Sequence, residues 1–390
     1  MSSLKNFDIT SCCLVITLMI IGLINIYSVT YFEGFEGFSL DNFFGKQLFF
    51  CFISILIFFL CIIPNIKIYF KYGSIIYILM IILLILVLFF GNEVNGSKSW
   101  FSIMGFSLQP SEFMKPITAL ALAKFLSNVH SDIQKTRIQI NSFLIISIPL
   151  ILIILQPDPG TALIFMSFYL VLHIIGLPSF YMNTFVSLIS IFLVTIFFGQ
   201  INIIIFFISI FILTLIYRIY KGLSKTRLIY YTISSIVFIL CVDFIFNNVF
   251  EQRHRDRFNI VLGLEQDNRG IGYNTNQSQL AFKSGGVLGQ GFLNGAQTKG
   301  DFIPEQHSDY IFSTIGEEWG FTGSFFTIII FTVLLLRIVK RTEKQRNLFH
   351  KIYSYSVITL IMFHFGINIS MVIGIFPSVG IPLPFISYGG

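Results

Sequence analysis

The chain has 390 residues, of which 55% are hydrophobic and 11% are charged. Its mean hydropathy is +0.82 and its formal net charge is +6. Because a soluble globular domain has roughly 25% charged residues, the composition excludes that class and predicts an all-α, polytopic integral membrane protein. The basic residues are divided among short loops without a continuous stripe, which argues against a nucleic-acid site.

Apolar segments long enough to cross a bilayer follow one another along the chain. We expect eleven of them, at 11–31, 46–63, 73–91, 110–127, 142–156, 159–176, 180–198, 201–217, 228–248, 309–336 and 351–375, and the start of a twelfth at Ile381. Since we find no internal repeat and no linker, about ten to twelve transmembrane helices form one membrane domain over residues 1–390. The first segment is longer than a signal-peptide core and is expected to be retained.

Lysine and arginine in the short loops predict the orientation, because cytoplasmic loops carry the excess of these residues. A cytoplasmic N-terminus places the following on that side: Lys67, Lys71, Lys135, Arg137, Arg218, Lys221, Lys225, Arg227, Arg337, Lys340, Arg341, Lys344 and Arg346. It also places Glu33, Glu36, Asp41 and the segment 248–308 outside. All five cysteines lie in apolar segments, without the spacing of a metal site.

The extracytoplasmic loop, about 248–308, is long enough that we expect it to be functional. Its basic and glycine-rich positions are Arg253, His254, Arg255, Arg257, Lys283, the stretch SGGVLGQGF at 284–292, and Lys299. Arginine matches phosphate oxygens and glycine lets backbone N–H groups approach a ligand, so the basic residues are candidate contacts of a phosphorylated headgroup. The alternative is that the arginines contact anionic lipid and the glycines only make turns.

Asp309 lies in FIPEQHSDYIFSTIGEEWG, where this loop meets the apolar segment 309–336. Polarity beside lipid requires a reason, and Asp309 is the leading candidate for chemistry; its structural alternative is a helix N-cap. Ser313, Gly316 and Gly320 share its helix face. This stripe of small residues predicts either tight helix packing or a groove, wide enough for a lipid tail, that leads from the carboxylate.

Glu317 and Glu318 follow ~12 to 14 Å further along this helix. In hydrocarbon they must be protonated, paired or facing a polar cavity.

Polar residues elsewhere mark further positions. Pro110 suits the first turn of a helix on which Glu112 and Lys115, three residues apart, can form an ion pair. Lys98 is a candidate phosphate contact in an interfacial turn, and Asp158 before Pro159 is expected to cap a helix.

The stretch FPSVGIPLPFISYGG at 376–390 is too rich in proline and glycine for a regular helix. Irregular backbone at membrane depth is tolerated where it is buried in protein or lines a cavity, so this segment is a candidate wall of the site. His173 and His364 are expected to be satisfied core residues.

Several motifs occur in order from residue 95 to the end: NGSKSW, LQPSEFMK, QPDPGTA, GYNTNQSQLAFKSGGVLGQGFLNGAQ, PEQHSDYIFSTIGEEWGF and GIPLPFISYGG. In this order and topology they closely resemble the shape, elongation, division and sporulation family of membrane glycosyltransferases. Gln306 and Ile381 favour its elongation branch, which maintains cell shape, over its division branch.

The resemblance implies polymerisation of lipid II, an undecaprenyl-pyrophosphate-linked disaccharide-pentapeptide, into peptidoglycan at the bacterial plasma membrane. It carries a catalytic aspartate onto Asp309 and a supporting charged pair onto Glu112 and Lys115, and it implies a class B penicillin-binding transpeptidase and the elongation complex as partners. Glycosyl transfer with inversion needs a base for the acceptor hydroxyl and positive charge for the departing pyrophosphate. A divalent cation would suit the second task, but no carboxylate cluster marks a site for one.

The chain also departs from the family pattern. Ser99 stands where a second basic residue is usual, and Pro159 stands where leucine is usual. The segments 180–198 and 201–217 are interpreted as two additional helices, and the sequence stops at Gly390, where the family continues through its last helix. A precursor flippase and a noncatalytic scaffold stay open as alternatives, although a transporter would place its polar residues near the bilayer midplane.

Overall fold

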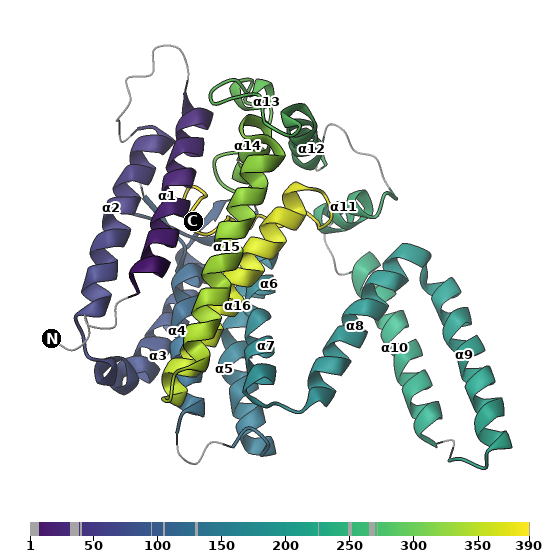
Figure 1. The fold of residues 1–390 in the computed structure, drawn as a ribbon. Helices are drawn as coiled ribbons and strands as arrows, with labels where there is room; N and C mark the ends of the chain where they lie inside the picture. Colours follow the sequence, from purple (N-terminus) through teal and green to yellow (C-terminus); the bar gives the residue numbers. More distant parts are fainter. Residues whose placement is uncertain are drawn as a thin grey trace. The chain divides into compact units, whose positions relative to one another are not determined.

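The computed structural model describes residues 8–31, 39, 41–94, 96–103, 106–128, 132–224, 226–248, 252–264, 270 and 272–389 (Figure 1). Glu33, Glu36 and Lys225, and the side chains of Arg227 and His254, lie outside what is described. The chain forms two compact units: Met1–Leu177 with Tyr273–Gly390, and Pro178–Gly272. The organisation of residues 1–390 as a single membrane domain, expected from the sequence, stays a prediction.

The first unit contains twelve helices among its described residues and a small antiparallel sheet of order β1-β2-β3. Its elements are α1 (Ile9–Thr30), α2 (Phe43–Ile62), α3 (Ile66–Phe90), β1 (Asn92–Val94), β2 (Ser97–Ile103), β3 (Phe106–Leu108), α4 (Pro110–Leu126), α5 (Thr136–Ile154), α6 (Pro159–Phe165), α7 (Ser167–Ile175), α12 (Tyr273–Gly285), α13 (Ala296–Lys299), α14 (Ile311–Glu318), α15 (Gly320–Glu343) and α16 (Leu348–Val372).

Short polar side chains mark where several of these helices begin. Asp8, Asn42, Asn65, Asp158 and Asn347 each accept a hydrogen bond from a backbone N–H in the first turn of the helix that follows. These N–H groups have no partner within the helix, so each cap stabilises its helix by about 1 kcal/mol. The prediction that Asp158 is an N-cap is confirmed.

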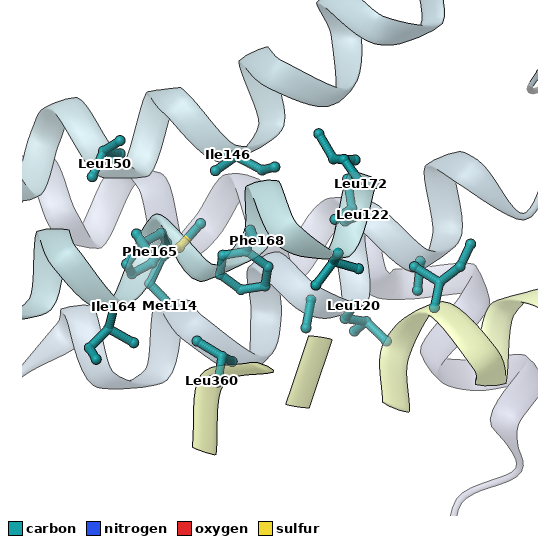
Figure 2. Close-up of a cluster of buried hydrophobic side chains, with 14 of the residues drawn as sticks. Met114, Leu120, Leu122, Ile146, Leu150, Ile164, Phe165, Phe168, Leu172 and Leu360 are labelled. Atoms are coloured by element: carbon teal, nitrogen blue, oxygen red, sulfur yellow. The ribbon is translucent and has the colours of Figure 1, made fainter. Parts of the chain in front are cut away.

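The larger core of the first unit lies where α4, α5, α6, α7 and α16 meet (Figure 2). Met114, Phe165 and Phe168 are fully buried there, and Leu360 brings α16 onto the same cluster. A second core joins α1, α14, α15 and α16. The remaining surface of the long helices is apolar and exposed, as expected for side chains that face lipid.

The second unit consists of α8 (Ser179–Phe198), α9 (Gln200–Tyr220), α10 (Thr226–Asn248) and α11 (Gln252–Val261). Helix α10 packs against both α8 and α9, and few side chains of these helices are buried. Whether α8 and α9 are additional to the family fold stays a prediction.

All eleven predicted apolar segments coincide with helices. Within the described residues, nine helices are long and apolar enough to cross a membrane. The predicted segment 159–176 is divided into α6 and α7, and the segment 309–336 is divided into α14 and α15 at Gly320, whose φ is +66°. Most side chains disfavour this left-handed conformation, so Gly320 permits the helix to break.

Two predictions about irregular segments are corrected. No helix starts at Ile381: residues 377–383 have no regular secondary structure, and residues 384–389 form turns and a bend. The stretch around Lys98 is not merely a turn but forms the three-strand sheet, in which Glu93 pairs with Lys98.

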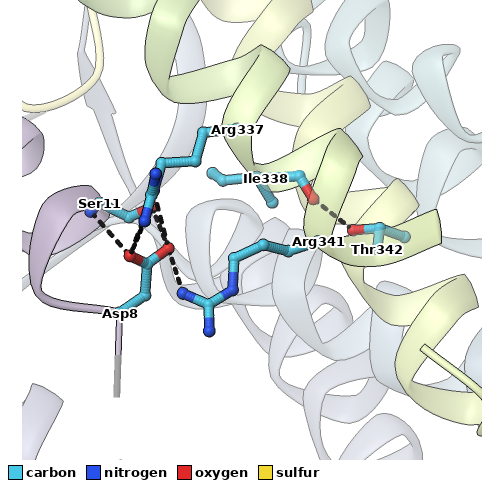
Figure 3. A network of polar contacts seen from close by, with 6 residues as sticks. All are labelled: Asp8, Ser11, Arg337, Ile338, Arg341 and Thr342. Carbon is cyan, nitrogen blue, oxygen red and sulfur yellow. Dashed lines mark hydrogen bonds and ion pairs between the residues drawn. The ribbon is translucent and has the colours of Figure 1, made fainter. Parts of the chain in front are cut away.

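An ion cluster joins the N-terminus of α1 to the C-terminal half of α15 (Figure 3). The Asp8 carboxylate accepts from Arg337 at 2.7 Å and from Arg341 at 2.5 Å. These guanidinium groups, Arg337 foremost, hold the pKa of Asp8 well below its usual range. The cluster connects residues more than three hundred positions apart in sequence.

Candidate functional site

Asp309 lies in a turn that precedes α14, and its side chain is half-buried. The N-cap position of α14 belongs to Tyr310, whose side chain makes no capping hydrogen bond. The N-cap alternative for Asp309 is therefore wrong. Its carbonyl oxygen accepts a hydrogen bond from Asn368 Nδ2 of α16 at 2.8 Å, which fixes the backbone of the turn.

The segment 377–389 lies directly against this turn. Gly380 adopts a φ of +68°, and a Cβ built on it would stand 3.3 Å from Asp309 Oδ2. Ser387 Oγ donates to the Ser308 carbonyl at 2.6 Å, and the Tyr388 N–H donates to the His307 carbonyl at 2.9 Å. The carboxylate is thus bordered by backbone rather than by a bulky side chain on this side.

Small residues on two helices let this irregular segment enter the bundle. A Cβ on Gly22 of α1 would stand 2.5 Å from the Ile386 carbonyl oxygen, and one on Gly160 of α6 would stand 2.5 Å from that of Val379. The Gly389 N–H donates to Gln47 Oε1 of α2 at 3.0 Å. Protein surrounds the segment on several sides, which satisfies the condition for irregular backbone at membrane depth.

The predicted ion pair on α4 is confirmed. Lys115 Nζ lies 2.7 and 2.8 Å from the two carboxylate oxygens of Glu112. The side chains differ in exposure: that of Lys115 is 5% exposed and that of Glu112 is 42% exposed. Glu112 is therefore the member of the pair that can meet a ligand, with Lys115 behind it.

Asp158 extends this polar region beyond its capping role. Its Oδ2 accepts from Gln109 Nε2 at 2.7 Å, just before α4, while Oδ1 accepts from the Thr161 N–H at 3.0 Å. Burial raises the pKa of Asp158, and the nearby Glu112 carboxylate adds to the rise against the opposing hydrogen bonds from Thr161.

His307 lies two residues before Asp309 and stacks on Phe43, with ring centroids 3.9 Å apart. Burial lowers the pKa of His307, although Glu305 and Asp301 act in the opposite direction. The imidazole is consequently neutral at pH 7 and serves as an aromatic contact.

Glu317 is paired with hydrogen-bond donors of the protein, which is one of the three states predicted for it. Its carboxylate, fully buried, accepts from the N–H groups of Gln297 and Thr298 at 2.7 and 2.9 Å, and from Thr298 Oγ1 at 2.7 Å. These are the first-turn N–H groups of α13, whose N-cap, Gly295, has no side chain to offer. Glu318 accepts from Ser28 Oγ of α1.

Neighbouring groups fill the space beside the small residues that follow Asp309. Ser313 is fully buried and donates to the Tyr310 carbonyl. A Cβ on Gly316 would stand 2.3 Å from the Phe282 ring, and one on Gly320 would stand 2.3 Å from the Gly289 nitrogen. In this structure the stripe packs against α12 and the loop after it, so the packing alternative describes these positions and the groove-lining prediction does not.

The six predicted pyrophosphate contacts are distributed over different elements. Lys98 on β2 donates to the Phe89 carbonyl at the end of α3, at 3.0 Å. Lys283 on α12 is exposed and borders a shallow cavity, and Lys299 ends α13 and is exposed. Arg253, Arg255 and Arg257 lie on α11 in the second unit, where Arg255 donates to the Asn247 carbonyl at 2.9 Å. Their role as phosphate contacts stays a prediction.

The contacts that two residues of α16 make with the site were not predicted from the sequence. The prediction that His364 is a satisfied core residue is confirmed: it is buried, and its Nε2 lies 2.8 Å from Lys115 Nζ. Asn368 contacts Asp309 and Ile381. Their spacing of four residues, which puts polar groups on one face of an apolar helix, is the signal that was available. Among the described residues, no group of three or more His, Cys, Asp or Glu is placed to hold a metal ion.

Known proteins resemble this chain in sequence and in fold. A model of the FtsW, RodA and SpoVE family, described as a cell cycle protein, matches residues 9–206 and 198–390. The peptidoglycan glycosyltransferase RodA of Treponema pallidum (strain Nichols) is 30% identical over 338 residues, which cover 80% of this chain and 77% of that protein. The probable peptidoglycan glycosyltransferase FtsW of Buchnera aphidicola subsp. Acyrthosiphon pisum is 30% identical over 358 residues, covering 89% and 75%.

A solved structure described as "Structural coordination of polymerization and crosslinking by a peptidoglycan synthase complex" has the same fold. It aligns with a TM-score of 0.70 at 22% identity, over 98% of this chain and 92% of that chain. The fold, the ordered motifs and the family match agree: the chain is a multi-pass membrane protein that belongs to the FtsW, RodA and SpoVE family.

Proposed function

We propose that this protein is a peptidoglycan glycosyltransferase that polymerises lipid II into glycan strands during cell elongation. Its relatives are named as peptidoglycan glycosyltransferases. The observation that carries the proposal is Asp309, a half-exposed carboxylate whose backbone is fixed by Asn368 and whose Oδ2 faces Gly380. A partly exposed carboxylate on a backbone held in place can remove the proton from an acceptor hydroxyl.

In this mechanism Asp309 takes the proton as the acceptor oxygen attacks the anomeric carbon, and the bond from that carbon to the pyrophosphate breaks. Positive charge must offset the charge that develops on the departing pyrophosphate. Lys115 already gives two hydrogen bonds to Glu112, so the exposed Lys283 and Lys299, with Lys98, are the proposed contacts in the first unit. Glu112 acts in support from the exposed side of its pair.

The test is lipid II polymerisation by the purified protein in lipid, together with its class B penicillin-binding transpeptidase. Asp309→Asn keeps the shape of the side chain and removes the base, so we expect the rate to fall by about 100-fold or more. The matched control is Asp301→Asn, an exposed residue of the same loop, which should stay active.

Equal polymerisation by wild type and Asp309→Asn would remove Asp309 from the mechanism. If wild type makes no glycan but carries lipid II across vesicle membranes, the protein is a transporter instead.

Relatives with RodA and FtsW names both resemble the chain. We assign it to the elongation branch on Gln306 and Ile381, and we infer a transpeptidase partner because the similar solved chain comes from a synthase complex that couples polymerisation to crosslinking. Rescue of rod shape in a strain depleted of its elongation polymerase supports this assignment; rescue of division alone would reverse it.

A further inference from the structure

One face of α16 contacts both halves of the proposed site. His364 and Asn368 are four residues apart, so they lie on the same face of the helix, about 6 Å apart along its axis. They are 8% and 0% exposed, in a helix apolar enough to cross a membrane. Each connects segments that are distant in sequence.

His364 completes the hydrogen bonding of Lys115. An ammonium group has three hydrogens and accepts nothing. Two of them reach Glu112 at 2.7 and 2.8 Å, and the third reaches His364 Nε2 at 2.8 Å. Since Nε2 must accept, the proton of the neutral imidazole is on Nδ1, which faces the Pro382 carbonyl oxygen at 3.4 Å. The ring therefore bridges α4 and the segment 377–389 in a single tautomer.

Asn368 uses both hydrogens of its amide in the same way. Nδ2 donates to the Asp309 carbonyl at 2.8 Å and to the Ile381 carbonyl at 2.7 Å. Pro382 and Ile381 are neighbours in the chain, and Gly380, which faces Asp309 Oδ2, precedes them. The two side chains consequently hold two consecutive residues, Ile381 and Pro382, against α16, directly after Gly380.

We propose that His364 and Asn368 are positioning residues that set the spacing between the Glu112–Lys115 pair and Asp309. The inference rests on the proposed transferase function and deepens it. Neither side chain is assigned a bond to the reacting atoms. His364 acts through Lys115 and Pro382, and Asn368 acts through the backbone of Asp309.

This role predicts which substitution of His364 is tolerated. Glutamine offers a carbonyl oxygen to Lys115 and an N–H group to Pro382, which are the two functions of the imidazole. Phenylalanine preserves the ring volume and provides neither. A purely packing role predicts the opposite order, with phenylalanine the better replacement.

The experiment compares wild type, His364→Gln, His364→Phe and the lipid-facing control Met362→Leu in the polymerisation assay with lipid II and the transpeptidase. We expect His364→Phe to lower kcat by about 10- to 100-fold, because catalytic groups shift by fractions of an ångström. KM should change by less than about threefold, because misplaced catalytic groups act mainly on the chemical step. His364→Gln should recover most of kcat, and Met362→Leu should match wild type.

Activity of His364→Phe equal to wild type overturns the inference and leaves the proposed function intact. Loss in His364→Gln as severe as in His364→Phe also overturns it, since the hydrogen bonds would then not matter. Inactivity of wild type itself counts against the proposed function instead. If His364→Phe does not fold, His364→Asn replaces it: the shorter amide cannot span Lys115 and Pro382, so activity equal to His364→Gln refutes the bridge.

Discussion

Glu317 shows how a single buried carboxylate can organise the loop that carries Asp309. It accepts hydrogen bonds from the backbone and the hydroxyl of Thr298, and the same hydroxyl accepts from Gln306 Nε2 at 3.0 Å. Gln306 also donates to Thr314 Oγ1 at 2.9 Å. The chain of bonds passes from α13 through the PEQHSD motif to α14, so the position of the turn at Asp309 depends on a side chain eight residues further on.

We expect Glu317→Gln to destabilise the folded protein by about 2 to 3 kcal/mol, because an amide nitrogen would face backbone N–H groups that need an acceptor. The measurement is thermal unfolding in detergent. Glu343→Gln, at the exposed end of α15, is the control and should leave the melting temperature unchanged. Equal melting temperatures for wild type and Glu317→Gln would show that the carboxylate is not needed as a cap.

At the scale of elements, α12, α14 and the loop after α12 touch through backbone. A Cβ on Gly285, the last residue of α12, would stand 2.0 Å from the Gly316 carbonyl oxygen, and one on Gly289 would stand 2.1 Å from that of Glu318. The Gln290 and Gly291 N–H groups donate to the Glu317 and Glu318 carbonyls. Such contacts form only where no side chains intervene, so glycine is required at these positions for close approach.

The chain offers a matched pair of helical glycines to test this. Gly285→Ala should destabilise by about 1 to 3 kcal/mol, because the methyl group meets backbone that cannot move aside. Gly366→Ala, on α16, meets nothing within 4 Å and should stabilise by about 0.5 to 1 kcal/mol through helix propensity. Unfolding midpoints that move in the same direction for both variants would contradict the packing described for α12.

The ion cluster between α1 and α15 should give the stability a defined pH dependence. The folded pKa of Asp8 is depressed, so its contribution is fully present above the unfolded value of about 3.9 and is lost as the pH falls through the folded value. The melting temperature of wild type should exceed that of Asp8→Asn at pH 7, and the difference should shrink below about pH 4. Glu93 is exposed on β1, so the control Glu93→Gln should have the same melting temperature as wild type at both pH values. A constant difference down to pH 2 would mean that Asp8 does not act through its charge.

For the molecule as a whole, local patterns in the sequence were sufficient to predict the membrane-spanning segments and the contacts between residues close in sequence. The Glu112–Lys115 pair and the Asp158 cap depend on spacing within one or two turns. The contact of Lys115 with His364 joins residues 249 positions apart, and no helical period encodes it. The break at Gly320 was missed because the backbone groups that approach this glycine, those of Val287 and Gly289, belong to the loop after α12, and no local pattern records them.

The predicted topology is also a property of the whole chain. With the five native cysteines replaced by serine, a cysteine at Lys299 should react with a membrane-impermeant maleimide in intact cells, and one at Lys344 should react only after the cells are opened. Both positions are exposed. The reverse pattern would place Asp309 on the cytoplasmic side and exclude it from extracytoplasmic glycan synthesis.

Gly295 and Glu317 occupy one space between them, since a Cβ on Gly295 would stand 2.7 Å from Glu317 Oε2. A chain that gains a side chain at 295 first suffers a collision, and one that first loses Glu317 leaves α13 without its cap. Either substitution alone should destabilise the protein. Together, serine at 295 and a smaller residue at 317 would restore the cap of α13, because serine is itself a good N-cap residue. We therefore expect sign epistasis, with these two positions changing together or not at all as the family diverges.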